Sequence, residues 1–279
     1  MIKNEIIIPV YNGQRYIKEL LDSLSKQTSK NFFIVIADNG SSDDSIKIAR
    51  TYTNKLNLQI LDASQDPGKG AALNKAVHYS RSKNLLFIDQ DDTVNSEYVQ
   101  KMDDALERFP IVASCMDSRK HNSHFKILPR DIAIDQRMGA YEVKTASGGT
   151  IGLTREAFDD IGGFDANFNY STNDVEFCWR AHQKGYNIQL VNGAILYYRL
   201  RNTIKENFKQ GIYYGIGNYH IAKRHPEIRG DQTRLTTLIL DICKLLLTFI
   251  SKVDSKERSA HFIGKNIGQA KEKIRDLFN

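Results

Sequence analysis

Residues 85–92 read Leu85-Leu86-Phe87-Ile88-Asp89-Gln90-Asp91-Asp92, four apolar residues followed by three carboxylates among four positions. The apolar run predicts a buried strand, and the acidic residues predict concentrated negative charge at the carboxyl edge of a sheet. Carboxylates this close repel one another and are costly to desolvate singly. A divalent cation such as Mg²⁺ or Mn²⁺ relieves that repulsion and often takes further ligands from water and phosphate. A solvated acidic turn is the alternative interpretation.

The sequence around this stretch alternates short apolar runs with helical patterns, which is typical of a parallel α/β sheet. The expected strands span 5–10, 32–38, 58–62 and 85–89, and the expected helices span about 15–26, 43–52 and 69–80. A further helix is predicted over 174–184, where Gly185 ends it. The periodicity weakens from residue 111, and the chain from residue 203 onward has a mainly helical pattern.

The composition, with 41% hydrophobic and 26% charged residues among 279, is that of a globular protein. Cys115, Cys178 and Cys243 are far apart and lack CxxC spacing, so we expect no disulfide framework and no structural zinc. The first residues lead directly into a strand pattern without a signal peptide. We therefore expect a cytoplasmic protein in a reducing compartment.

The net charge of +6 is concentrated toward the C-terminus, because the chain from Arg199 onward carries 16 Lys+Arg and 8 Asp+Glu. Nucleic acid or an anionic membrane surface would suit such a tail, and a solvated helical face is the plain alternative. Residues 235–250 are mostly apolar but contain Asp241 and Lys244, so they are too short and too charged to predict a transmembrane helix. They either lie in a membrane interface or pack on the main domain.

Several acidic and glycine-containing segments follow one another in an order that resembles family 2 glycosyltransferases of the GT-A fold. They are IIIPVYN at 6–12, IADNGSSD at 36–43, DPGKGAALN at 66–74, FIDQDD at 87–92, REAF at 155–158, IGGFD at 161–165 and NDVEFCWR at 173–180. The resemblance covers about residues 5–200. It implies a Rossmann-like α/β domain over 1–200, with a mixed, mostly parallel sheet flanked by helices, and a helical extension over 201–279. It also implies inverting transfer from a nucleotide sugar.

The resemblance assigns the acidic residues to the donor and its metal. Asp91 is the expected ligand of Mn²⁺ or Mg²⁺, and Asp89 is expected to contact the donor ribose or the metal. Asp92 either assists them or has a surface or helix-capping role. Asp38 resembles the family carboxylate that bonds the nucleobase, and a carboxylate accepts from an imide N–H, which favours a UDP-sugar. Asp38 is also suited to capping the turn that follows it.

Other residues are expected around the donor. Pro9, Val10 and Tyr11 would form the floor beneath the base, with Tyr11 as a stacking surface or, alternatively, a core or turn tyrosine. Lys69, between two glycines at a predicted helix start, is suited to phosphate. Arg199, like Arg201, is a candidate partner of the diphosphate or an ordinary surface arginine.

Asp174 matches the aspartate of the family's Glu-Asp motif and is the expected catalytic base, with a helix cap as its alternative role. Asn173 replaces the family glutamate, and Glu176 is the next candidate base. Tyr197 stands where related enzymes often have His before Tyr-Arg, so no histidine ligand is assigned.

The expected acceptor is a hydroxyl of a glycan or lipid-linked saccharide at the inner face of a membrane, without nucleic acid as a partner. Two other functions remain open. A sugar-phosphate nucleotidyltransferase would need a glycine-rich basic loop near the N-terminus, where this chain has Pro9-Val10-Tyr11-Asn12-Gly13. A degenerate, non-catalytic nucleotide-sugar-binding protein is compatible with Asn173 and Tyr197.

Overall fold

The computed structural model describes residues 3–65, 67–123, 136–138, 141–166, 168, 172–229 and 256–277. By its internal packing the chain forms two compact units. The first contains residues 1–136, 143–169 and 177–200, and the second contains 137–142, 170–176 and 201–279. The two short segments of the second unit fall inside the range that the sequence analysis assigns to the first domain. Residues 235–250, with their predicted membrane-interface role, lie outside the described part of the chain.

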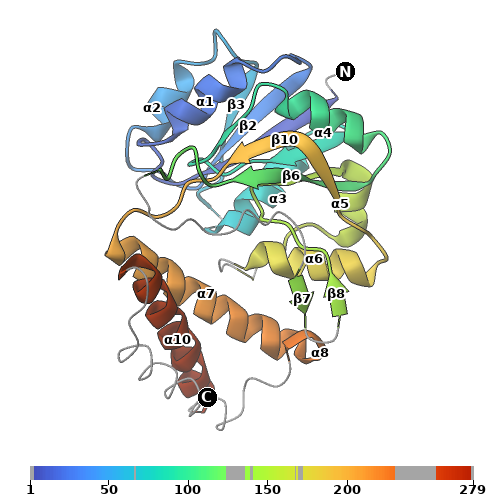
Figure 1. The fold of residues 1–279 in the computed structure, drawn as a ribbon. Helices are drawn as coiled ribbons and strands as arrows, with labels where there is room; N and C mark the ends of the chain where they lie inside the picture. The colour runs from blue at the N-terminus through green and yellow to red at the C-terminus, as the bar shows by residue number, and fades with distance from the viewer. Residues whose placement is uncertain are drawn as a thin grey trace. The chain divides into compact units, whose positions relative to one another are not determined.

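The first unit is built on a mixed sheet whose strands are ordered β3-β2-β1-β4-β9-β6-β10-β5. Figure 1 labels β2, β3, β6 and β10 of this sheet. Pairing is parallel between β1 and β2, β1 and β4, β2 and β3, and β6 and β10, whereas β9 is antiparallel to β4 and β6 and β5 is antiparallel to β10. The strands are β1 (Asn4–Val10), β2 (Phe32–Asp38), β3 (Leu58–Asp62), β4 (Asn84–Phe87), β5 (Thr93–Val94), β6 (Ile111–Asp117), β9 (Ile151–Thr154) and β10 (Gln189–Tyr197).

This sheet confirms the predicted mixed, mostly parallel α/β fold. The fourth predicted strand ends earlier than expected, at Phe87, because the chain turns at the acidic residues. The weakly periodic region after residue 111 contains β6 and β9. Two further short strands, β7 (Gln136–Met138) and β8 (Tyr141–Val143), pair with each other.

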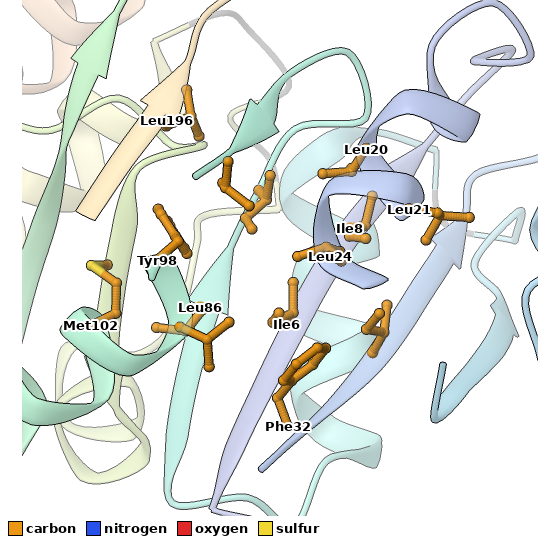
Figure 2. Packing of buried hydrophobic residues seen from close by; sticks show 14 of the residues in the cluster. Ile6, Ile8, Leu20, Leu21, Leu24, Phe32, Leu86, Tyr98, Met102 and Leu196 are labelled. Atoms are coloured by element: carbon orange, nitrogen blue, oxygen red, sulfur yellow. The ribbon is translucent and has the colours of Figure 1, made fainter. Parts of the chain in front are cut away.

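Helices cover both faces of the sheet, because the strand side chains alternate between two apolar clusters. Along β1, Ile6 and Ile8 enter the cluster formed with α1 (Ile17–Ser25), α2 (Ser45–Arg50) and α4 (Tyr98–Leu106). Ile7 enters the opposite cluster with α3 (Lys69–Tyr79), α5 (Arg155–Ile161) and part of α6 (Asn173–Gln183). Figure 2 shows the first cluster, in which Leu20, Leu21 and Leu24 of α1 pack over β1 and β2.

These residues are fully buried, and burial of each leucine or isoleucine side chain stabilises the fold by about 1.5–3 kcal/mol. Their 3.6-residue spacing on α1 and alternation along β1 explain why the sequence pattern predicts both elements.

The second unit contains α7 (Ile204–Arg224), α8 (Pro226–Arg229) and α10 (Lys256–Leu277). Thr203 and Glu206 form a capping box at the start of α7. Gly211 and Gly215 on α7 face the backbone of α10, and Gly264 and Gly268 on α10 face the backbone of α7. The two helices therefore pack at a distance that no side chain larger than hydrogen permits at these positions. Within the described residues, no helix combines the length and apolar character needed to cross a membrane.

Candidate active site

The candidate site lies at the carboxyl ends of β1, β2 and β4. These strands are parallel neighbours, with Val10 opposite Asp38 and Ile7 opposite Phe87, so the residues that follow them meet at one edge of the sheet. Ligands of open α/β sheets bind at this edge. The prediction from strand order is thus confirmed for the location of the acidic residues.

Asp38 ends β2 and shapes the turn after it. Its Oδ1 accepts the Ser41 backbone N–H at 2.9 Å, which is the capping role that the sequence left open beside base recognition. The neighbouring Asn39 joins two further segments, because its Nδ2 donates to the Ala63 carbonyl at 2.8 Å and its Oδ1 accepts the Gly68 N–H at 2.9 Å. Sequence reasoning missed Asn39, whose partners lie beyond any local pattern.

The three predicted floor residues differ in exposure. The Tyr11 side chain is 60% exposed at the sheet edge, so its ring is available for stacking and a core position is wrong, whereas the alternative of a turn tyrosine fits its place directly after β1. Val10 is 1% exposed and belongs to the apolar core, because its side chain points to the same face as Ile8. Val10 can therefore contribute only backbone to a ligand. Pro9 is half-buried in β1, opposite Ala37.

Asp89 and Lys69 form an ion pair of 2.5 Å between Asp89 Oδ1 and Lys69 Nζ, with both side chains partly exposed. Lys69 is the first residue of α3, so this cation stands at the helix N-terminus beside the acidic turn. Gly149 lies close by, since a Cβ on it would be 3.2 Å from the Asp89 carboxyl carbon and 3.3 Å from its backbone nitrogen. Asp89 is thus held between a cation and a close-packed backbone.

Asp92 is buried, with 2% exposure, so its expected surface role is wrong. Its Oδ1 accepts the Arg199 backbone N–H at 2.9 Å. Burial raises the pKa of the Asp92 carboxyl well above its ordinary value, and the neighbouring charges of Asp91 and Asp89 act in the same direction. Burial also raises the pKa of the Tyr98 hydroxyl nearby, with a smaller contribution from Asp92.

The Arg199 side chain holds the acidic turn in place. Its Nε donates to the Asp91 carbonyl at 2.9 Å, and a terminal nitrogen donates to Glu19 Oε2 of α1 at 2.6 Å. The guanidinium carbon also lies 5.0 Å from the centre of the Tyr16 ring. In this structure the guanidinium therefore positions the turn, a role that the sequence analysis did not assign to it.

Tyr197, which occupies the position where related enzymes often have histidine, lies next to a histidine from another segment. The ring centres of Tyr197 and His121 are 6.5 Å apart, and His121 Nε2 is 2.7 Å from Thr93 Oγ1. Burial lowers the pKa of His121, and the positive charge of Arg199 lowers it further. Nothing in the local sequence indicates this juxtaposition.

Asp174 lies in the first turn of α6, as predicted, and its Oδ1 accepts the Val175 N–H at 2.8 Å. It is half-buried, whereas Glu176, the alternative base, is 1% exposed. Glu176 Oε1 is 3.9 Å from His225 Nε2 within the second unit. A buried carboxylate beside an imidazole is poorly placed to meet a substrate hydroxyl, so Asp174 is the better candidate of the two.

Comparison with known sequences identifies the family. Residues 5–162 match the sequence profile of Glycosyl transferase family 2, and residues 85–254 match that of Glycosyl transferase family group 2. The chain belongs to glycosyl transferase family 2. One relative is the poly(ribitol-phosphate) β-N-acetylglucosaminyltransferase TarS of Staphylococcus aureus, 38% identical over 100 residues. That alignment covers 35% of this chain and 18% of TarS.

Solved structures share the GT-A fold of this family 2 chain. TarS residues 1–349 of S. aureus in complex with UDP-GlcNAc superpose with a TM-score of 0.57 at 17% identity, covering 99% of this chain and 92% of that one. The mannosyltransferase PcManGT from Pyrobaculum calidifontis, in complex with GDP-Man and Mn²⁺, superposes with a TM-score of 0.66 at 15% identity. This second likeness covers 98% of this chain and 87% of that one.

The acidic turn of this family 2 chain fits a hard divalent cation. Asp89 and Asp91 carry carboxylate oxygens, and among the described residues no group of three His, Cys, Asp or Glu side chains is placed to hold a metal ion. Mg²⁺ and Mn²⁺ suit such a set, because a cation bound by one or two carboxylates keeps positions for water and substrate phosphates. The metal role of Asp89 and Asp91 therefore stays a prediction.

Proposed function

We propose that this protein is an inverting glycosyltransferase that moves a sugar from a UDP-sugar to a hydroxyl of a glycan or a lipid-linked saccharide. The observation that carries the proposal is the gathering of an exposed aromatic ring, Tyr11, with Asp38, Asp89 and Lys69 at one edge of the sheet of a family 2 chain. These groups supply a stacking surface, a hydrogen-bond acceptor and opposite charges for one extended donor.

The donor's base and diphosphate have separate partners in this proposal. The Tyr11 ring stacks on the base, and Asp38 accepts a hydrogen bond from the imide N–H, which uracil carries and cytosine lacks. Lys69 at the start of α3 exchanges part of its pairing with Asp89 for the diphosphate. The complex of TarS with UDP-GlcNAc supports a uridine nucleotide, while that of PcManGT with GDP-Man and Mn²⁺ makes the guanine nucleotide the competitor to test.

Asp91 and Asp89 would hold Mn²⁺ or Mg²⁺. When bound, the cation acts as a Lewis acid that stabilises the negative charge of the leaving diphosphate. Arg199 supports this function through the protein, because it holds the Asp91 carbonyl and the Asp92 carboxyl in their observed positions.

Asp174 acts as the base. Its carboxylate takes the proton of the acceptor hydroxyl as that oxygen attacks the anomeric carbon, and the bond from that carbon to the diphosphate oxygen breaks in the same step. The nucleoside diphosphate leaves with the electron pair, and the single displacement inverts the anomeric configuration. Asn173 beside Asp174 contributes no charge to this step.

The decisive experiment measures transfer and donor hydrolysis across a panel of UDP- and GDP-sugars, with and without Mn²⁺. We expect a UDP-sugar to be consumed, and Asp174→Asn should lower kcat by about 10²–10⁴-fold. Asp91→Asn should remove the increase in activity that Mn²⁺ gives to the wild type. Asp104→Asn on the exposed face of α4 is the matched control and should retain full activity.

Full activity in both site variants would refute these assignments. Release of pyrophosphate from a nucleoside triphosphate and a sugar phosphate would indicate a nucleotidyltransferase instead. Nucleotide binding without turnover would indicate a non-catalytic binding protein.

We further propose that the basic chain from Arg199 onward holds the enzyme on an anionic membrane surface, where a growing polysaccharide or lipid-linked acceptor is made. The excess of 16 Lys+Arg over 8 Asp+Glu supports electrostatic attraction to anionic lipids. The protein with this basic segment should sediment with phosphatidylserine vesicles at low salt and less at high salt. Equal sedimentation with neutral and anionic vesicles would contradict this attachment.

A further inference from the structure

The side chain of Gln90, between the two carboxylates Asp89 and Asp91, pairs with the backbone of Tyr11. Gln90 Oε1 accepts the Tyr11 N–H at 2.9 Å, and Gln90 Nε2 donates to the Tyr11 carbonyl at 3.1 Å. A primary amide offers one acceptor and two donors in a plane, so it can bond to both polar groups of a backbone residue at once. Gln90 thus bonds Tyr11 as the backbone of a neighbouring strand would.

This pairing continues the contact between β1 and β4 beyond the point where their backbones separate. The regular pairing ends with Ile7 opposite Phe87, and the Ile88 N–H still donates to the Ile7 carbonyl at 3.2 Å. After Ile88 the acidic turn leaves the sheet, and the Gln90 amide then makes the hydrogen bonds between this turn and the segment after β1. The segment after β1 and the acidic turn are therefore tied by two hydrogen bonds across 79 positions of sequence.

Gly13 makes room for this amide. A Cβ at Gly13 would lie 2.7 Å from Gln90 Cδ and still closer to Oε1, so an alanine would displace the Gln90 side chain. The Gly13 backbone is itself held, because its N–H donates to Ser45 Oγ at 2.7 Å and its carbonyl accepts the Ile17 N–H at 3.0 Å. The half-buried side chain of Gln90 therefore lies against a turn that is bonded to the start of α1.

We propose that Gln90 is a positioning residue that sets the Tyr11 platform at a fixed distance from the Asp89 and Asp91 carboxylates. This inference rests on the proposed function, in which Tyr11 stacks on the base and the acidic turn serves the diphosphate. Base and diphosphate belong to one molecule, so their two binding features must keep matched spacing. Fixing that spacing before the donor arrives lowers the cost of ordering on binding.

The first test compares Gln90→Met with the wild type. Methionine keeps the length of the side chain but removes both hydrogen bonds, which are of ordinary net strength. We expect UDP affinity in the presence of Mn²⁺, measured by calorimetry, to fall by about tenfold. The donor KM should rise in parallel while kcat changes by less than about threefold, because the acceptor hydroxyl and its base are untouched. Gln100→Met, on the exposed face of α4, is the matched control and should bind UDP like the wild type.

The second test needs no donor. In the wild type without nucleotide, the Tyr11 amide proton should be protected from hydrogen exchange by Gln90, and Gln90→Met should remove this protection. A third variant tests the space at Gly13. Gly13→Ala should weaken UDP binding in the wild type but much less in a Gln90→Ala background, since the atoms it displaces are then absent.

Wild-type affinity for UDP in Gln90→Met, or an unchanged Tyr11 exchange rate, would overturn the positioning role. If the wild type binds no nucleotide, the proposed function fails and the positioning role toward a donor fails with it. If the Tyr11 amide is nevertheless protected in the wild type and exposed to exchange in Gln90→Met, the hydrogen bond between Gln90 and Tyr11 exists and only the proposed function is wrong.

Discussion

Replacing Arg199 by methionine should destabilise the first unit even when no donor is present. The change removes a hydrogen bond from a charged donor to the Asp91 carbonyl, worth about 1.5–3 kcal/mol. It also removes a partly exposed ion pair with Glu19, worth about 0.2–1 kcal/mol, and a cation–π contact with Tyr16, worth about 0.5–1 kcal/mol. Because these contacts share one side chain and are coupled, we expect a loss of about 2–4 kcal/mol in the free energy of unfolding.

The assay is urea unfolding at neutral pH without nucleotide, followed by the fluorescence of Trp179. This is the single tryptophan of the chain, and it is buried in the first unit. The backbone bond from the Arg199 N–H to Asp92 survives the substitution, so the acidic turn should loosen rather than lose all its anchors. Arg119→Met is the matched control, because Arg119 is 72% exposed and pairs with Asp117, and it should cost less than about 1 kcal/mol.

An Arg199→Met protein with the unfolding midpoint of the wild type would refute this reasoning. If its donor KM rose at the same time, Arg199 would act on the diphosphate directly, as the sequence alone suggests. Loss of stability without donor is the result that assigns Arg199 to the turn.

Three further changes test other parts of the fold. Burial raises the pKa of Glu5 above its ordinary value of 4.5, so the stability of the wild type falls as the pH rises from 4.5 through the pKa of the folded state. In urea unfolding, Glu5→Gln should gain stability relative to the wild type over this pH interval. A difference between the two proteins that does not change with pH would contradict this prediction. Gly215→Ala should destabilise the second unit by about 1–3 kcal/mol in thermal unfolding, because its Cβ overlaps the Lys265 carbonyl; an unchanged Tm would show that the helices adjust freely. Gly149→Ala should lower kcat/KM by up to about tenfold, because the added Cβ would shift Asp89 by a few tenths of an ångström, and wild-type kinetics would show that the site tolerates this shift.

The local pattern of residues predicts much of the fold because burial imposes a period on each element. Alternation along residues 5–10 and the spacing of Leu20, Leu21 and Leu24 correctly predict a strand and a helix. The local pattern does not predict β9, since its four residues show no clear alternation and it pairs with strands distant in sequence.

The positions of the acidic side chains can be predicted from the sequence, whereas their contacts cannot. The sequence alone determines that Asp38, Asp89 and Asp91 stand at strand ends on one edge of a sheet, because parallel strands connected through helices end on the same side. It also determines, through ordered motifs, the family to which the chain belongs.

Only the tertiary structure decides which of these side chains are exposed and what holds them. Val10 and Asp92 are buried, Arg199 reaches a carbonyl 108 positions away, and Gln90 pairs with a residue 79 positions away. A periodic pattern reports which face of an element is apolar, whereas these contacts depend on how distant segments meet at the sheet edge. The sequence of residues 85–92 thus predicts where the site lies, and the packing of the chain around this segment determines the role of each residue.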